Sequence, residues 1–493
     1  MLWIALYLPD LSLQIAARSE HQSVTKASRL PLVIQHGPTN RPLVFAANAA
    51  ARAMGIETAM SVAGAQALVN DLLVLTRHPQ KEDAALHNLA VWAGQFTPHI
   101  VVQSKQGLRL EVESCLNMFK GLPQLLVTLR QGLRELGYSA RLGIAPTGRG
   151  AWLLAKASAQ HSGIRSCTQI NELVERLWPL PLALFGWPVT TLSLLQQLGV
   201  TRVGHMIELP RAGVVQRFGL AVLNDLDHAL GLLPDPQPCF VPPDTFAARI
   251  EFLQEVTQTE ALLFAIKRML LELGGFLRAR GAGVQQFALI LQHSGRDKMH
   301  TPMTIGLLAP ERDAARLLLL ARERIERDKL PRPVVALSLV ADALLPYAPN
   351  NQSLLPTERR SALGWQQLQE RLHARVGKDK VFILQPGNDH RPEWATVLID
   401  PGKEGKVQRR EHRTPRPMWL LPKPQPLSLT LGEPYYHGTL NLTAGPERLE
   451  CGWWDSNGVG RDYFVAQNNP GETLWLYREH HNRNGWFLHG LFA

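Results

Sequence analysis

The sequence predicts an α+β protein of several domains that ends in a small β-rich module. Its 493 residues are enough for three or four domains. Segments with strand-like and helix-like periodicity alternate up to about residue 345, and a proline-rich stretch at 234–243 divides that region. After residue 427, aromatic and polar residues alternate between turns that contain Asn and Gly. This pattern is typical of antiparallel strands.

The composition is that of an ordinary folded protein, with 45% hydrophobic and 19% charged residues. Lys and Arg exceed Asp and Glu by 52 to 42. This excess favours a polyanion such as nucleic acid as a partner, and a mildly basic protein without one is an equally open alternative. No apolar run is long enough to cross a membrane, and the four cysteines lie too far apart in the sequence to form zinc-binding pairs. We therefore expect a cytoplasmic protein with free thiols.

The first 170 residues predict a β-sheet with helices packed on it. Leu2–Leu8 is an apolar run of strand length that Pro9-Asp10 ends. A strand at Leu30–Ile34 follows, and a second strand, from Leu43, runs into an Ala-rich helix from Ala46. The spacing of apolar residues then predicts helices at 63–75, 81–92 and 122–136, a strand at 140–145 and a helix at 151–156.

A hairpin is predicted around residues 100–113. Ile100–Val102 is its first strand, and Lys105-Gln106-Gly107 is the turn. In the second strand, apolar residues alternate with charged ones, namely Leu108, Leu110 and Val112 with Arg109, Glu111 and Glu113. This period of two predicts a half-buried strand with its charged residues on the solvent face.

Residues 250–345 predict the element order β-α-β-β-α-β. The strands are expected from residue 250, at 285–292, around 303–305 and at 334–340, and the helices at 260–279 and 310–328. This order is typical of ferredoxin-like domains.

The hairpin turn resembles the catalytic segment of the Y-family (translesion) DNA polymerases. Those enzymes carry Ser-Ile-Asp-Glu-Ala-Tyr-Leu-Asp after Tyr/Phe-Ser/Thr-Pro and a short strand. Here Ser104–Glu111 follows Phe96-Thr97-Pro98 and the strand Ile100–Val102, and it matches the family run in register without a gap. The adjacent Asp and Glu of the family fall on Gln106 and Gly107. Because Mg²⁺ is bound through carboxylates, these two residues cannot hold the metal ions of the family. The resemblance therefore implies a pseudo-polymerase with no metal and no cofactor.

Three other residues match functional positions of the family. Arg52 matches the Arg of the fingers motif Asn-Tyr-x-Ala-Arg, which contacts the triphosphate, whereas Ala49 replaces the Tyr. Lys156 matches the second Lys of Asn-Lys-x-x-Ala-Lys, another phosphate contact. Asp10 is the one acid left near the opening Asp-x-Asp. The residue types alone leave open a solvated helix-surface charge for Arg52, a snorkelling lysine for Lys156 and a turn or N-cap residue for Asp10.

The resemblance implies a complete domain plan. It assigns a palm at 1–19 and 77–170, fingers at 20–76, a helical thumb with a helix-hairpin-helix-like turn at 171–233, a proline-rich linker at 234–243, a ferredoxin-like little finger at 244–345, a clamp-binding loop at 346–360, a linker or partner-binding tail at 361–426 and a β-rich C-terminal module at 427–493.

The segment Gln352-Ser353-Leu354-Leu355-Pro356 is similar to the Gln-x-x-Leu-Phe peptide of bacterial sliding-clamp ligands, with Pro in place of the aromatic residue. Gln352, Leu354 and Leu355 are the expected clamp contacts. Such a peptide binds in an extended form through a few apolar anchors.

Motifs in the C-terminal module, among them Gly452-Trp453-Trp454-Asp455 and Arg461–Val465, resemble the non-catalytic branch of the Y family. That branch implies a scaffold for DNA repair and SOS mutagenesis. Its partners would be primer–template DNA, the sliding clamp, an ImuA-type RecA-like protein and an error-prone C-family polymerase, with no membrane. Two alternatives are a divergent but active polymerase that uses Asp10, Glu111 and Glu113 as substitute metal ligands, and a plain DNA-binding factor.

Overall fold

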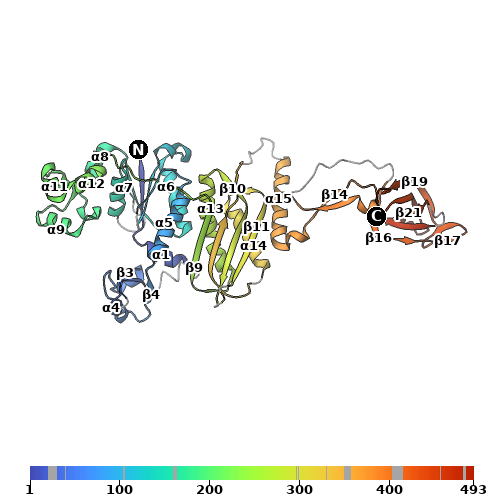
Figure 1. Ribbon diagram of the computed structural model, residues 1–493, viewed down its shortest axis with the longest axis horizontal. Coiled ribbons are helices and arrows are strands. Elements are labelled where there is room, and N and C mark those ends of the chain that lie inside the picture. The colour runs from blue at the N-terminus through green and yellow to red at the C-terminus, as the bar shows by residue number, and fades with distance from the viewer. Residues whose placement is uncertain are drawn as a thin grey trace. The chain divides into compact units, whose positions relative to one another are not determined.

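The computed structural model describes residues 1–19, 30–38, 40–103, 106–158, 164–295, 297, 299–328, 330–348, 357–401, 415–455, 457–480 and 485–492. The chain divides into two compact units, Met1–Arg375 and Val376–Ala493. Together they confirm an α+β protein with a β-rich C-terminal part (Figure 1). Among the described residues, no helix is both long and apolar enough to cross a membrane.

The palm is a five-stranded sheet in the order β5-β6-β1-β7-β8. Its strands are β1 Trp3–Tyr7, β5 Ile100–Gln103, β6 Gly107–Glu111, β7 Arg141–Ala145 and β8 Ile164–Ser166. Successive residues of a strand point to opposite faces, so Ile4 and Leu6 enter one core and Ala5 enters another. The first core contains residues of α5 Pro79–Ala93 and α6 Leu122–Leu136, and the second contains residues of α7 Gly148–Ala157.

The second hairpin strand differs from its prediction in two ways. Arg109 is buried, with 4% of its surface exposed, and its guanidinium donates to Asp235 at 2.8 Å. Asp235 lies in the proline-rich segment 234–243, which therefore contacts the palm sheet. The strand also ends at Glu111, because Glu113 begins the 3₁₀ helix η1 Glu113–Phe119. A period of two could not reveal a buried arginine, since its partner lies far along the chain.

The fingers region holds a small sheet in the order β3-β2-β4, made of β2 Leu32–His36, β3 Leu43–Ala47 and β4 Leu73–Thr76. Its helices are α3 Ala49–Ala53 and α4 Val62–Leu68. The side chain of Asn48 caps α3 by accepting from the Ala51 N–H, so this helix begins later than predicted. The predicted helix over 63–75 is wrong in its second half, because β4 pairs in parallel with β2 there.

The thumb is helical, as expected for residues 171–233. Its elements are α8 Ile170–Leu177, η2 Leu182–Phe185, α9 Val189–Gln197, α10 Val203–Ile207, α11 Arg211–Phe218 and α12 Leu220–Leu230. Their apolar residues share one core with α7 of the palm.

The little finger has the predicted β-α-β-β-α-β order in a sheet β11-β10-β12-β9. Its elements are β9 Phe246–Val256, α13 Thr259–Ala279, β10 Ala282–His293, β11 His300–Glu311, α14 Ala314–Arg327 and β12 Val334–Ala341, and the short β13 Leu344–Pro346 pairs with β10. The helix α14 begins after its cap Asp313, so the predicted start at 310 lies inside β11. The long α15 Thr357–Val376 follows.

The palm and the little finger are joined by tight packing. The indole of Trp92 on α5 fits against two glycines, since a Cβ on Gly132 of α6 or Gly275 of α13 would lie 2.4 or 2.6 Å from its ring atoms. Arg18 of α1 Leu11–Ser19 also donates to Glu272 of α13 at 2.5 Å, and both side chains are largely buried. A buried ion pair of this kind holds one relative position, because moving either partner leaves an unpaired charge.

The second unit is built on the sheet β16-β22-β21-β20-β19. Its strands are β16 Trp419–Pro426, β19 Asn441–Cys451, β20 Val459–Gln467, β21 Thr473–Glu479 and β22 Trp486–Leu491, with a small hairpin of β17 Ser428–Thr430 and β18 Glu433–Tyr435. It also includes η3 Lys378–Lys380, β14 Ile383–Pro386, η4 Pro392–Trp394 and β15 Thr396–Ile399. The unit therefore begins about fifty residues earlier than the predicted module at 427.

A buried polar cluster lies in this second unit. The Nδ1 atom of His489 is 2.9 Å from the hydroxyl of Tyr463, and the rings of Tyr463 and Trp475 stack against the imidazole. Glu393 lies 3.6 Å from Nε2 and accepts from Arg461 at 2.6 Å. The pKa of His489 is lowered to about 4, chiefly by burial. Glu393 acts to raise this pKa, and Arg461 and Arg416 act to lower it.

We expect the second unit to lose stability as the pH falls. The pKa of His489 drops from 6.5 to about 4 on folding. Below pH 6.5 the His489 side chain is protonated in the unfolded chain, whereas in the folded chain it stays neutral down to about pH 4. The folded state therefore has its full stability above pH 6.5, and its free energy of unfolding falls by about 3 kcal/mol between pH 6.5 and pH 4. Urea unfolding followed by near-ultraviolet circular dichroism from pH 4 to 7 measures this slope. His489→Leu should flatten it, and an equal slope in the variant would contradict the assignment.

Candidate functional site

The candidate site lies at the end of the palm sheet where β1 finishes and β6 begins. Tyr7 pairs with Gly107 across these strands, and the Leu8 N–H donates to the Gln106 carbonyl at 2.8 Å. Asp10 lies in the turn that follows β1. Gln106, Gly107 and Asp10, three positions that the sequence resemblance singled out, thus lie at the same end of the paired strands β1 and β6.

The backbone at Gly107 leaves no space for a side chain. Its φ is +156°, and a Cβ built on it would lie 1.8 Å from the carbonyl oxygen of Leu6 and 2.9 Å from the carbonyl carbon. Both of these atoms belong to the backbone of β1, so they cannot move aside as a flexible side chain would. The strand pairing of β6 with β1 therefore depends on glycine here, and a glutamate would require the two strands to separate locally.

Asp10 is engaged by the residue that was predicted to bind phosphate. The guanidinium of Arg52, on α3, lies 3.7 Å from the Asp10 carboxylate. The Asp10 carbonyl also accepts from the Gln14 N–H at the start of α1 Leu11–Ser19. This position is that of a turn residue before a helix, the alternative that the residue type had left open. Arg52 remains 48% exposed, so its guanidinium is accessible to a phosphate as well.

Tyr7, Arg141 and Trp152 lie on the side of the palm sheet beside Gly107. The Tyr7 ring meets the Trp152 indole edge to face at 5.5 Å, and the Arg141 guanidinium is 5.8 Å from the Tyr7 ring centre. Burial raises the pKa of Tyr7, and the charge of Arg141 opposes that rise. Arg141 was missed by sequence reasoning, because one basic residue at the start of a strand carries no distinguishing signal.

Lys156 points to the thumb. Its Nζ donates to the carbonyl oxygen of Leu184, in η2, at 2.6 Å. Burial lowers the pKa of this amine, and the nearby Arg149 lowers it further. The contact fixes the end of α7 against the thumb.

The substitute ligands of the alternative enzyme hypothesis lie apart. Glu111 pairs with Trp3, at the opposite end of β1 from Tyr7 and Gly107. Since β1 has 5 residues, its ends lie about 13 Å apart. Glu113 forms an ion pair with the N-terminal amine at 2.5 Å, which also lies at that far end. Asp10, Glu111 and Glu113 therefore cannot share a metal ion, and this part of the alternative is wrong.

No group of three or more His, Cys, Asp or Glu side chains that could hold a metal occurs among the described residues. The predicted clamp contacts Gln352, Leu354 and Leu355 lie outside the described residues.

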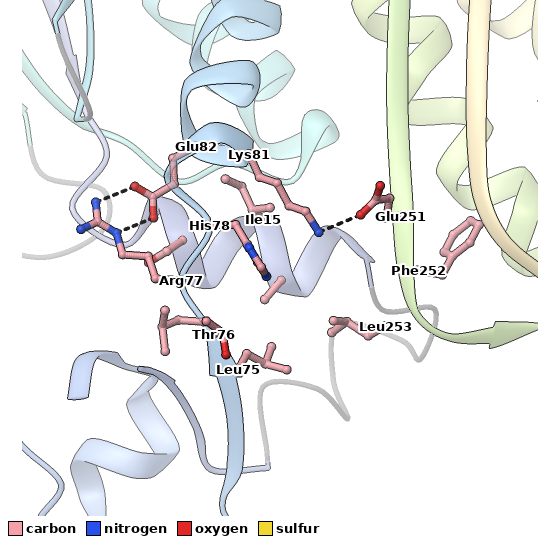
Figure 2. A pocket seen from close by; sticks show the side chains of 13 residues that line it. Ile15, Leu75, Thr76, Arg77, His78, Lys81, Glu82, Glu251, Phe252 and Leu253 are labelled. Atoms are coloured by element: carbon pink, nitrogen blue, oxygen red, sulfur yellow. Dashed lines mark hydrogen bonds and ion pairs between the residues drawn. The ribbon is translucent and has the colours of Figure 1, made fainter. Parts of the chain in front are cut away.

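A cavity of about 160 Å³ lies where α1, α5 and β4 meet β9 of the little finger (Figure 2). Ile15, Leu75 and Leu253 give it apolar walls. Lys81 on α5 reaches across to Glu251 on β9 at 2.8 Å, while Arg77 binds Glu82 through two hydrogen bonds of 2.9 and 2.7 Å. Both cations are engaged by carboxylates, so this cavity marks a joint between three domains and offers little to an anionic ligand.

Residues 16–156 match the impB/mucB/samB family. The chain is 28% identical over 464 residues to Protein ImuB of Caulobacter vibrioides, covering 89% of this chain and 100% of that protein. It is also 23% identical over 291 residues to DNA polymerase IV of Alkaliphilus oremlandii, covering 57% of this chain and 71% of that protein. Among solved structures, DinB from Sulfolobus solfataricus aligns at 16% identity with a TM-score of 0.40, covering 71% of this chain and 100% of that one.

We expect Gly107→Ala to destabilise the first unit by about 1–3 kcal/mol, because the added methyl group meets the backbone of Leu6. Gln106→Ala is the matched control. The Gln106 side chain is exposed, so its removal should change stability by no more than about 0.5 kcal/mol. Thermal unfolding of the two full-length variants measures both effects. Equal melting temperatures would show that the turn tolerates a side chain.

Proposed function

Because the chain carries an impB/mucB/samB domain and is an ImuB-like Y-family protein, we propose that it is a non-catalytic scaffold of translesion synthesis and SOS mutagenesis in the bacterial cytoplasm. It binds primer–template DNA and the sliding clamp, and it recruits an error-prone C-family polymerase that carries out nucleotide insertion. An ImuA-type RecA-like protein is a further partner.

The absence of polymerase activity rests mainly on Gly107. A two-metal site needs carboxylates fixed beside the primer end. At this position, the contact between the Gly107 backbone and the Leu6 carbonyl leaves no room for one. The neighbouring Gln106 supplies an amide, and the remaining acid, Asp10, already faces Arg52. This arrangement supports a centre that has lost its ability to hold Mg²⁺.

A DNA-binding role is supported by the chain's charge and by its relatives. The net charge is +10, and several curated relatives are named DNA polymerase IV. Arg52 is partly exposed near the head of the palm sheet and is a candidate phosphate contact, because a guanidinium can bind two phosphate oxygens at once. Lys156 is the weaker candidate, since its amine already donates to Leu184.

In a primer-extension assay with Mg²⁺ or Mn²⁺, we expect the purified protein to insert no nucleotide above the background of a blank preparation. Asp10→Ala is the control, because Asp10 is the acid at the end of the sheet where Gly107 lies. Template-directed insertion by the wild-type protein that Asp10→Ala abolishes would overturn the scaffold proposal in favour of an active polymerase.

Replacing Gln352 and Leu355 together with Ala should weaken binding to the purified sliding clamp at least tenfold, because the peptide loses its polar and apolar anchors at once. Affinity for primer–template DNA should stay within twofold of wild type. Surface plasmon resonance on immobilised clamp measures the first quantity, and fluorescence anisotropy measures the second. Undiminished clamp binding would remove this segment from the proposal, and wild-type protein without clamp affinity would favour a plain DNA-binding factor.

A further inference from the structure

The helix α15 packs on the little finger with its polar side inward and its apolar side outward. Trp365, Leu368 and Leu372 are 55%, 45% and 37% exposed, and their spacing of three and four residues places them on one face. We call these three side chains the apolar stripe. On the opposite face, Glu370 is only 2% exposed and Ala374 packs against the little-finger core. A surface helix ordinarily buries its apolar face, so α15 is reversed in this respect.

The buried polar face fixes the orientation of α15. The Glu370 carboxylate accepts from the Leu308 N–H of β11 at 2.9 Å and forms an ion pair with Arg316 of α14. The Arg371 guanidinium donates to Glu323 of α14 at 2.9 Å. Rotating the helix to bury the stripe would leave these groups without partners, and an unpaired buried charge is costly. The little finger therefore holds the apolar stripe toward solvent.

Such a stripe has the form of a helix that binds in a groove. Single exposed apolar side chains are normal on protein surfaces, whereas apolar anchors at positions i, i+3 and i+7 of one helix are the pattern that an apolar groove recognises. An indole and two leucines supply a large apolar area for this. Because α15 is already folded and held in place, little backbone entropy is lost when it binds.

The position of α15 in the chain identifies the sliding clamp as the partner. The predicted clamp peptide at 352–356 ends directly before Thr357, the first residue of the helix. Trp365 follows eight residues later, about 12 Å along the helix axis. A clamp that holds the peptide therefore lies within reach of the stripe, and no linker separates the two contacts in the sequence.

The charges around the stripe favour a protein surface over a nucleic acid. Gln366 and Gln367, the residues between its first two members, are neutral. The two nearby cations, Arg371 and Arg375, both face Glu323 of α14. A phosphate backbone is bound chiefly by unpaired Lys and Arg side chains, whereas the stripe itself offers only apolar groups.

We propose that the apolar stripe of α15 is a second contact surface for the sliding clamp, docking in an apolar groove beside the pocket that takes the peptide. This inference rests on the proposed function, which includes clamp binding through the peptide. Two adjacent contacts on one chain reinforce each other, because the second forms at a high effective concentration once the first is made. They also fix the orientation of the little finger on the clamp, which a peptide alone leaves free.

The test uses the full-length protein and purified clamp, with surface plasmon resonance on immobilised clamp. Trp365→Ala combined with Leu368→Ala and Leu372→Ala should weaken clamp binding at least about fivefold, mainly through faster dissociation, although the peptide is intact. The affinity for primer–template DNA should stay within about twofold. Since the three side chains are exposed, the melting temperature should stay within about 2 °C of that of the wild type.

Two further variants serve as controls. Trp454→Ala removes an indole that is 63% exposed in the second unit, and it should leave clamp affinity within about twofold. Leu368→Lys should weaken clamp binding because it places a charge in the apolar contact, whereas Leu368→Met should preserve it.

The outcomes separate this inference from the function on which it rests. If the triple variant binds the clamp as the wild type does, while Gln352→Ala with Leu355→Ala weakens binding, the stripe is not a clamp contact and the proposed function stands. A loss of binding confined to DNA, to the RecA-like protein or to the C-family polymerase would overturn the inference and assign the stripe to that partner. A wild-type protein without clamp affinity would overturn both proposals.

Discussion

The contact between the Gly107 backbone and the Leu6 carbonyl is the constraint on which the palm depends. It lets β6 lie against β1 at the end of the sheet where Tyr7 pairs with Gly107. β1 is the central strand and pairs with both β6 and β7, so a change at this contact would affect the whole sheet. The backbone at Gly107 leaves no room for a carboxylate side chain. This arrangement supports the proposed scaffold role more strongly than the identities of Gln106 and Gly107 do alone.

Buried ion pairs and one tryptophan hold the domains of the first unit together. The linker is fixed to the palm by the buried pair of Arg109 and Asp235, and the little finger is fixed by Trp92 and by the pair of Arg18 and Glu272. Buried ion pairs contribute little net stability, but they select one arrangement, because any other leaves a charge unpaired. The linker and the little finger are thereby each held in one position on the palm.

Much of this could be predicted from the sequence where the signal is local. The order of elements in the little finger follows from apolar spacing, and the degenerate positions Gln106 and Gly107 follow from a motif that aligns without a gap. The failures came from contacts distant in sequence. Arg109 looked like a solvent-facing charge because Asp235, its partner, lies 126 residues away. Leu73–Thr76 looked like the end of a helix because only the pairing with β2 makes it a strand. The segment before residue 427 was predicted to be a linker. It is part of the second unit through contacts such as that of Arg391 with Asp455, more than sixty residues further on, which a local sequence pattern cannot reveal.

The joint between palm and little finger has a practical consequence for dissecting the protein. Val91 of the palm belongs to the apolar core of the little finger, and Leu271 of the little finger packs on the core of the palm. A fragment cut at the proline-rich linker would therefore expose the apolar residues of this joint on each piece, which favours aggregation. Division near residue 375, between the two compact units, spares that core. Genetic truncations that end at the linker should accordingly be interpreted as loss of the folded protein and not as removal of one activity.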